Sequence, residues 1–278
     1  EEALDNSRRM EAKGFRHSFD MLGEAAATAA DAERYFRDYE RAVHAIGRAA
    51  GGRGVVDGPG ISVKLSALHP RYSRAQRERV VAELLPRVLA LAVLARRYDI
   101  GLNIDAEEAD RLDLSLDILE ALCLAPELAG WDGIGFVAQA YGKRAAAVVD
   151  WLVDLARRSN HRLMVRLVKG AYWDSEIKRA QADGLEDFPV FTRKVHTDVS
   201  FLACARIPRA PAAGERRQLL LRQPHRRPFG PGRGADRRPG RSRARGRAGA
   251  GRPAPPHRPP ARPVPAGTAE LRRAGFVR

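Results

Sequence analysis

The sequence contains few cysteines and no long apolar run. Only two cysteines, Cys123 and Cys204, occur among its 278 residues, and both lie in apolar, helix-like surroundings. Two thiols so placed are typical of small core residues in a reducing compartment, rather than of a disulfide or a metal site. No stretch of about 18 apolar residues is present, which excludes a transmembrane helix. The chain starts at Glu1 without an apolar leader, so we expect a piece of a longer cytoplasmic protein.

Lysine is absent from residues 207–278, although this segment is strongly basic. It contains 19 of the 49 basic residues, all arginine, and three of the 34 acidic residues. Residues 1–206 are left with 30 basic and 31 acidic residues, so the excess positive charge of the chain arises entirely after them. Arg, Pro, Ala and Gly make up 54 of the last 72 residues. Because such a segment has no periodic apolar face, we predict that 207–278 is a disordered tail.

Three interpretations of this tail compete. It could bind RNA through arginine–phosphate contacts, or it could be attracted to anionic lipid. It could also be the translation of a shifted reading frame, because codons for Arg, Pro, Ala and Gly can be written entirely in G and C. The absence of lysine, whose codons are rich in A, favours the shifted frame. For residues 1–206, which carry no excess charge, we expect no contact with nucleic acid.

After a lead-in at 1–15, residues 16–206 alternate between apolar strand-like runs and amphipathic helical segments. We predict strands within 19–26, 60–68, 100–106, 133–140 and 162–170, and helices at 30–49, 73–97, 110–124, 143–158, 173–182 and 192–206. Strands that are apolar on both faces and alternate with helices predict a parallel sheet covered by helices.

A doubly wound sheet and a (β/α)8 barrel share this alternation, and the polar residues favour the barrel. They gather at the C-terminal ends of the predicted strands, as Glu24, Ser66, Asp105, Glu107, Gln139 and Lys169. In a barrel those ends meet at one mouth, where catalytic groups lie. The GxGxxG of a dinucleotide-binding sheet is absent. We therefore predict an α/β fold, a TIM-type barrel that is incomplete because about five of its eight units are present.

Charged residues inside predicted strands require a chemical explanation. Lys64 lies in an apolar strand, where desolvation is costly without a partner, and Asp105 ends the neighbouring strand pattern. A Lys64–Asp105 pair could be a structural ion pair, a Schiff-base lysine with its acid, or a cation that holds a substrate carboxylate. Arg166 also lies within a strand, where it could meet an acid or a cofactor heteroatom.

Four long segments resemble the signature stretches of the proline dehydrogenase barrel of the bifunctional PutA family, in the same order. They are GPGISVKLSALHPRYSRAQ (58–76), YDIGLNIDAEEADRLDLSLD (98–117), LAGWDGIGFVAQAY (128–141) and RLMVRLVKGAYWDSEIKRAQ (162–181). EAKGFRHSFDMLGEAA (11–26) and FTRKVHTDVSFLACA (191–205) are similar to it too. The resemblance covers about residues 10–206, and four long motifs in order are far more specific than one short pattern.

The resemblance implies FAD-dependent oxidation of L-proline to 1-pyrroline-5-carboxylate, with electrons passed to a membrane quinone. It implies a cytoplasmic enzyme that lies peripherally at the inner membrane, with a fused or partner pyrroline-5-carboxylate dehydrogenase and no metal. By the same resemblance Lys64 binds the proline carboxylate, Asp105 holds that lysine, Tyr172 packs on the substrate ring and Arg166 lies near flavin N5. The implied cofactor-binding residues are Ala106, Glu107, Val137, Gln139, Arg166, Val168, Lys169, Gly170, Ala171, Thr192 and Lys194.

The sequence departs from the family pattern after residue 206. The family continues with a strand whose histidine contacts FAD, and it ends with a helix whose arginine pair clamps the substrate carboxylate. Neither is recognisable here, since His225 and His257 lie in Arg/Pro-rich runs. Glu24, which in the family pairs with one of those arginines as a gate, would have no partner. We therefore expect weak folding, poor FAD retention and little activity.

The coding DNA across Ala205–Ile207 tests the shifted-frame interpretation. Translated in the other two frames, it is expected to restore an apolar strand with a histidine, and further on a helix with two adjacent arginines. If neither frame restores them, the basic tail is genuine and its binding to RNA or lipid becomes the interpretation to test.

Overall fold

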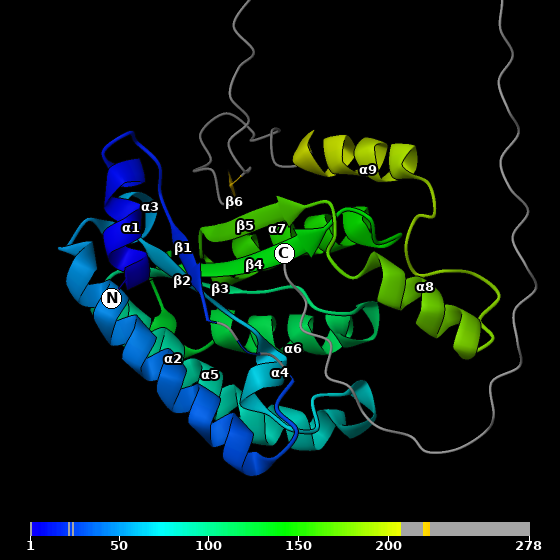
Figure 1. Cartoon of the computed structure of the whole chain (residues 1–278), viewed down its shortest axis with the longest axis horizontal. Coiled ribbons are helices and arrows are strands. Elements are labelled where there is room, and N and C mark those ends of the chain that lie inside the picture. Colours follow the sequence, from blue (N-terminus) through cyan, green and yellow to red (C-terminus); the bar gives the residue numbers. More distant parts are fainter. Residues whose placement is uncertain (1, 22, 24, 207–218, 223–278) are drawn as a thin grey trace, which may run out of the picture. The chain divides into compact units, whose positions relative to one another are not determined.

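In the part of the chain that the structure describes, the sheet contains six parallel strands in the order in which they occur in the chain (Figure 1). The structure is a computed structural model that describes residues 2–21, 23, 25–206 and 219–222. Its strands are β1 (Ser18–Asp20), β2 (Gly60–Val63), β3 (Gly101–Ile104), β4 (Ile134–Gln139), β5 (Leu163–Val168) and β6 (Leu219–Arg222). Each strand pairs with the strand before it. Because a doubly wound sheet reverses its strand order, this succession is the winding of a barrel.

Helices connect the strands and pack in sequence along the sheet. They are α1 (Glu2–Glu11), α2 (Ala29–Ala50), α3 (Gly54–Asp57), α4 (Leu65–Leu68), α5 (Arg77–Arg97), α6 (Leu112–Cys123), α7 (Ala145–Ser159), α8 (Trp173–Ala182) and α9 (Lys194–Arg206). Short 3₁₀ turns lie at Arg74–Gln76, Ala109–Arg111 and Pro126–Leu128. Along the chain α2, α5, α6, α7 and α9 each contact the next, as expected for the outer layer of a barrel. None of the helices in the described ranges combines the length and the apolar character needed to cross a membrane.

The two faces of the sheet carry different side chains. Ile61, Val63, Leu102, Ile104 and Phe136 are almost completely buried, in the core that the covering helices share. The alternate positions form a row of smaller residues across the strands, in which Ser62 pairs with Asn103, Asn103 with Gly135 and Gly135 with Met164. Since side chains alternate between the faces of a strand, Val137 and Arg166 lie on this same inner face, nearer the mouth.

Two segments of the structure are compared with the prediction because they differ from the expected pattern of elements. The segment expected to be one strand over 60–68 ends at Val63, and Leu65–Leu68 forms a helical turn. Leu219–Arg222, within the segment predicted to be a disordered tail, forms β6 and pairs with β5. The rest of this tail lies outside the described residues. The two cysteines are buried and unbonded, as predicted.

The inner face is tightly packed at Gly135, and this gives a test of the register. A Cβ added at Gly135 would lie 1.9 Å from Asn103 Oδ1 and 2.8 Å from the Met164 carbonyl oxygen. We expect Gly135→Ala to lower the free energy of unfolding by about 1–3 kcal/mol, measured by urea denaturation. Asn103→Ala should relieve the side-chain part of the clash, so the double variant should be more stable than the sum of the single effects predicts. Strictly additive effects would show that the two residues are not neighbours.

Candidate active site

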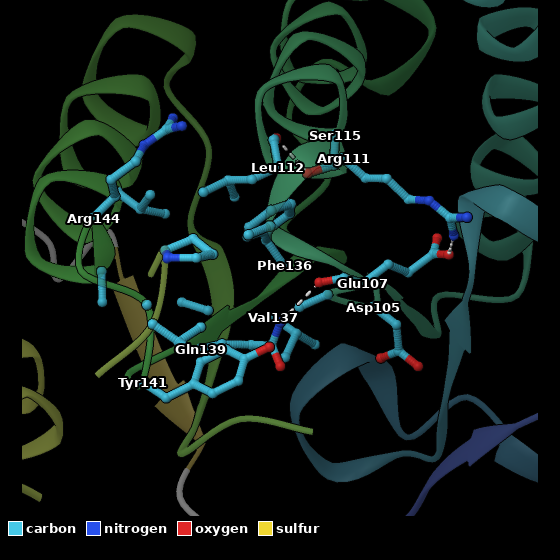
Figure 2. Close-up of a pocket in the computed structure, with 18 of the residues that line it drawn as sticks. Asp105, Glu107, Arg111, Leu112, Ser115, Phe136, Val137, Gln139, Tyr141 and Arg144 are labelled. Atoms are coloured by element: carbon cyan, nitrogen blue, oxygen red, sulfur yellow. Dashed lines mark hydrogen bonds and ion pairs between the residues drawn. The ribbon is translucent and has the colours of Figure 1, made fainter. Parts of the chain in front are cut away.

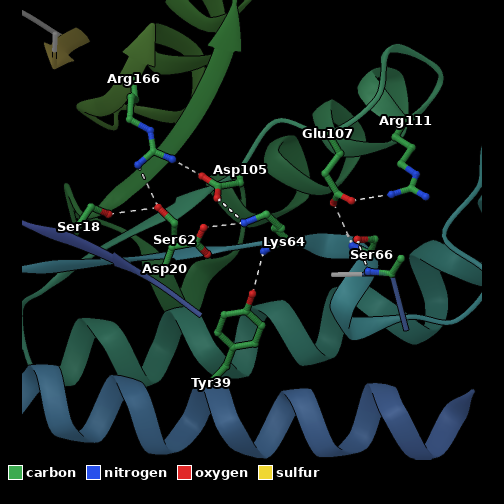
Figure 3. Close-up of polar contacts among 11 residues, drawn as sticks. Ser18, Asp20, Tyr39, Ser62, Lys64, Ser66, Asp105, Glu107, Arg111 and Arg166 are labelled. Atoms are coloured by element: carbon green, nitrogen blue, oxygen red, sulfur yellow. Dashed lines mark hydrogen bonds and ion pairs between the residues drawn. The ribbon is translucent and has the colours of Figure 1, made fainter. Parts of the chain in front are cut away.

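Two features lie at the C-terminal ends of the strands. One is a cavity of about 300 Å³ whose lining includes Asp105, Glu107, Val137 and Gln139 (Figure 2). The other is a cluster of paired charges around Lys64 and Asp105 (Figure 3). Both lie where a barrel carries its catalytic groups.

The charged cluster is centred on Asp105, which follows β3. Its Oδ2 lies 3.3 Å from Lys64 Nζ, and its Oδ1 pairs with the Arg166 guanidinium. Arg166 also donates to Ser62 Oγ at 3.1 Å. Lys64 makes a second and closer ion pair, 2.7 Å to Asp20 Oδ2 at the end of β1. The predicted Lys64–Asp105 contact is present, and Arg166 meets the same carboxylate.

Burial differs along this cluster, and burial and the neighbouring charges together set the pKa of each group. The Asp105 and Lys64 side chains are 9% and 14% exposed, whereas that of Asp20 is 50% exposed. Burial raises the pKa of Asp105, and the Arg166 and Lys64 charges oppose that rise. Burial alone would lower the pKa of Lys64, but the two carboxylates outweigh it, and the pKa is raised. Lys64 is therefore a fixed cation at neutral pH. A Schiff-base nucleophile needs a neutral amine, so this arrangement favours the carboxylate-binding interpretation.

Helix α2 supports the cluster from behind. The backbone N–H of Lys64 donates to the Tyr39 hydroxyl at 3.1 Å, and burial raises the pKa of Tyr39 to about 12. This bond fixes the chain where β2 ends and Lys64 turns toward the mouth. The capping box of Thr28 and Asp31 begins α2 and so helps to place Tyr39.

A second network links the loops after successive strands. The Glu107 carboxylate accepts a hydrogen bond from Ser66 N–H at 3.0 Å and pairs with Arg111 at 2.6 Å. Gln139 donates to the Glu107 carbonyl at 2.9 Å and accepts from Ala171 N–H at 3.0 Å. Burial raises the pKa of Glu107, although Ser66 and Arg111 lower it. Both carboxylate oxygens of Glu107 are thus occupied within the protein.

The loop after β5, residues 169–171, forms an exposed surface beside Arg166, termed the shelf. Lys169, Gly170 and Ala171 are exposed, and the ring of Tyr141 packs where a Cβ on Gly170 would lie. Gly170 adopts a φ of 145°, which favours glycine, so the shelf depends on this residue in two ways. Tyr172 is half-buried at the start of α8.

Beyond the shelf, two lysines converge near the start of α9. Lys169 and Lys194 both pair with Asp198, and these bonds lower the pKa of Asp198 to about 2. Thr192, just before α9, is exposed. A guanidinium beside an exposed backbone shelf, followed by two cations near a helix N-terminus, suits a flavin ring with an anionic diphosphate.

The remaining predicted site residues fall near these two networks. Val137 is buried on the inner face, and Ala106 and Val168 are half-buried. Glu24 lies outside the described residues. Asp20 was not predicted as a site residue, although an acid directly after Phe19 was a usable signal for the end of the first strand.

Comparisons with known proteins show the family to which the chain belongs. The family model described as proline dehydrogenase matches residues 3–214, so the chain belongs to the proline dehydrogenase family. Within it, the chain is similar to the bifunctional protein PutA of Escherichia coli, with 70% identity over 205 residues, which are 74% of this chain and 16% of that protein. PutA of Rhizobium meliloti is 69% identical over 201 residues, 72% of this chain and 16% of that protein.

Comparison with solved structures agrees with this family assignment. A crystal structure of a mutant of proline utilization A (PutA) from Bradyrhizobium japonicum matches with a TM-score of 0.71 and 54% identity, over 75% of this chain and 21% of that one. Proline dehydrogenase 1 of Bacillus subtilis subsp. natto is 28% identical over 176 residues, 63% of this chain and 50% of that protein. The chain thus spans about a sixth of the PutA proteins that it matches.

The ion pairs of Lys64 give a pH-dependent test. Lys64→Met leaves Asp105 with only Arg166, and we expect it to lower the free energy of unfolding at pH 7 by about 1–3 kcal/mol. The folded-state pKa of Lys64 is raised, so its contribution is fully present below the ordinary value of 10.5 and is lost as the pH rises through the folded-state value. The difference between wild type and variant should therefore shrink above pH 10.5 in urea denaturation.

Lys143→Met is the matched control, because Lys143 pairs with Asp187, whose side chain is 73% exposed. It should cost less than about 1 kcal/mol. An equal loss for the two lysine variants at pH 7, or a loss at Lys64 that stays constant to pH 11.5, would contradict this account of the cluster.

Proposed function

We propose that this chain carries the catalytic site of an FAD-dependent proline dehydrogenase, which oxidises L-proline to 1-pyrroline-5-carboxylate. The observation that carries the proposal is the position of Lys64, a permanent cation held by Asp20 and Asp105 at the barrel mouth. A fixed cation there suits the carboxylate of an amino acid. When bound, FAD would accept the hydride that leaves C5 of proline.

The residues of the chain would orient the substrate and the cofactor. Lys64 would bind the proline carboxylate, and Asp105 would hold both Lys64 and Arg166 in place. Arg166 would lie near N5 of the flavin, where its positive charge stabilises the electron-rich reduced ring. Tyr172 would pack against the substrate ring.

The flavin would rest on the shelf after β5. Backbone groups of Lys169, Gly170 and Ala171 would line its ring, and the Gln139 side chain, already bonded to Ala171, would fix its edge. Thr192 and Lys194 would bind the diphosphate. The other residues that we propose for this pocket are Ala106, Glu107, Val137 and Val168.

Electrons would pass to a membrane quinone, and the site would work in the cytoplasm at the surface of the inner membrane. A fused or partner pyrroline-5-carboxylate dehydrogenase would consume the product. Nothing in the described part of the chain favours a nucleic-acid-binding function instead. The histidine strand and arginine pair expected from the resemblance are not recognisable after residue 206. We therefore propose that this chain holds FAD weakly and turns over little.

Titration of FAD into the purified chain tests both parts of the proposal. The purified chain is expected to contain less than one FAD per molecule, and to saturate only when FAD is added. Quenching of flavin fluorescence measures the binding. Arg166→Met should weaken this binding about tenfold, since it removes a charge-assisted contact. Arg158→Met is the control, because Arg158 pairs with Glu120 on the helical layer. It should leave binding unchanged.

The outcomes separate the two parts. Full flavin occupancy with rapid proline-dependent dye reduction would contradict the proposed impairment. If FAD does not bind at millimolar concentration, or if Arg166→Met binds it as wild type does, the proposed flavin shelf is wrong.

A further inference from the structure

Asp20 and Asp105 hold the same lysine, but only Asp105 has both of its carboxylate oxygens occupied. Asp105 Oδ2 contacts Lys64 Nζ, and its Oδ1 pairs with Arg166. Asp20 uses Oδ2 for Lys64, at 2.7 Å, and its Oδ1 has no polar partner among the described residues. The Asp20 side chain is 50% exposed, whereas that of Asp105 is 9% exposed. Asp20 therefore presents an unused carboxylate oxygen at the mouth of the barrel (Figure 3).

The sheet fixes the position of Asp20, although its side chain is exposed. Asp20 is the last residue of β1 and pairs with Ser62 of β2, two residues before Lys64. The hydroxyls of Ser18 and Ser62 lie 3.2 Å apart and add a side-chain hydrogen bond between the same two strands. Because the register of β1 and β2 is set in this way, the unused oxygen of Asp20 stays beside the Lys64 ammonium.

The charges of this cluster balance. Lys64 and Arg166 contribute two positive charges, and Asp20 and Asp105 contribute two negative charges. A ligand that carries only a carboxylate would be attracted by Lys64 but repelled by Asp20. A ligand that carries a carboxylate and an ammonium adds one charge of each sign and keeps the balance. The cluster is therefore complementary to a zwitterion, and it discriminates against a simple anion.

Lys64 keeps one hydrogen-bond donor for such a ligand. An ammonium group has three N–H donors, and within the described part of the chain the Lys64 ammonium reaches two carboxylates. Its third donor can bind a ligand carboxylate without loss of either ion pair. Asp20 Oδ1 can accept from a ligand N–H in the same way. The two charged groups of an amino acid can thus be bound while the existing contacts are kept.

We propose that Asp20 binds the secondary ammonium of the amino acid substrate while Lys64 binds its carboxylate, an inference that rests on the proposed function. Lys64 alone would accept any small carboxylate, and Asp20 restricts the site to carboxylates that also carry an ammonium. Two contacts of opposite charge also fix the orientation of the substrate ring, because one contact would leave the ring free to rotate about it. Asp20 is thus a specificity-determining residue.

Two ligands that differ at one ring position test this assignment. L-proline has a secondary ammonium where cyclopentanecarboxylate has a methylene, and the two share ring size and carboxylate. The measurement is the dissociation constant of each for the purified 278-residue chain, by ligand-observed NMR at neutral pH without flavin. Wild type is expected to bind proline about five- to tenfold more tightly. Asp20→Asn should weaken proline binding about fivefold and strengthen cyclopentanecarboxylate binding about twofold, because Lys64 loses a counter-ion.

Changes of opposite sign for the two ligands distinguish a charge role from a structural one, since loss of structure would weaken both. Asp20→Glu keeps the carboxylate and should keep most of the preference for proline. Asp187→Asn is the matched control, because it removes an exposed acid that pairs with Lys143, and it should leave both constants unchanged. An unchanged ratio of the two constants in Asp20→Asn, or parallel weakening of both ligands, would overturn the inference alone.

Lys64→Met separates the inference from the proposed function. This variant should weaken the binding of both ligands, because both carry the carboxylate that Lys64 is proposed to hold. If Lys64→Met binds both ligands as wild type does, or if wild type binds neither, Lys64 is not a carboxylate site. The proposed function then fails, and the role of Asp20 fails with it.

Discussion

The position of Asp105 between two cations is the constraint on which the mouth of this barrel depends. A carboxylate that is 9% exposed is costly to ionise unless opposite charges lie against it, and Lys64 and Arg166 supply them from strands on either side. Those contacts exist only if β2, β3 and β5 keep their register, because a shift of one residue turns every side chain to the other face. The same charges that define the site therefore also specify the alignment of the sheet.

Hydrogen bonds between loops give the rim of the barrel its rigidity. Ala25 N–H donates to Ser66 Oγ, Ser66 N–H to Glu107, Gln139 to the Glu107 carbonyl, and Ala171 N–H to Gln139. This series connects the loops that follow β1 to β5. A rim connected in this way holds side chains in place before a ligand arrives, which reduces the entropic cost of binding. Glu107 contributes through its fixed position, since its carboxylate is already bound within the protein.

Much of this arrangement could be predicted from the sequence because it depends on periodicity. A lysine within one apolar strand and an aspartate at the end of the next predicted the Lys64–Asp105 contact, and the polar residues at the ends of the predicted strands favoured the barrel over a doubly wound sheet. Asp20 was missed because the apolar run around it extended the first predicted strand to Glu24. The helical turn at Leu65–Leu68 was missed because its residues suit a strand equally well, and the contact of Ser66 with Glu107 comes from a distant loop. The cavity depends on how α6 and α7 pack, which periodicity does not specify.

The consecutive pairing of the strands also bears on how the chain folds. Each described strand pairs with the strand just before it, so none of the pairings among residues 18–168 and 219–222 must wait for a later part of the chain. Such a topology allows assembly from the N-terminal end while the polypeptide is still leaving the ribosome, one strand–helix unit at a time. A change late in the gene would therefore shorten this sheet and leave the pairing of its earlier strands intact.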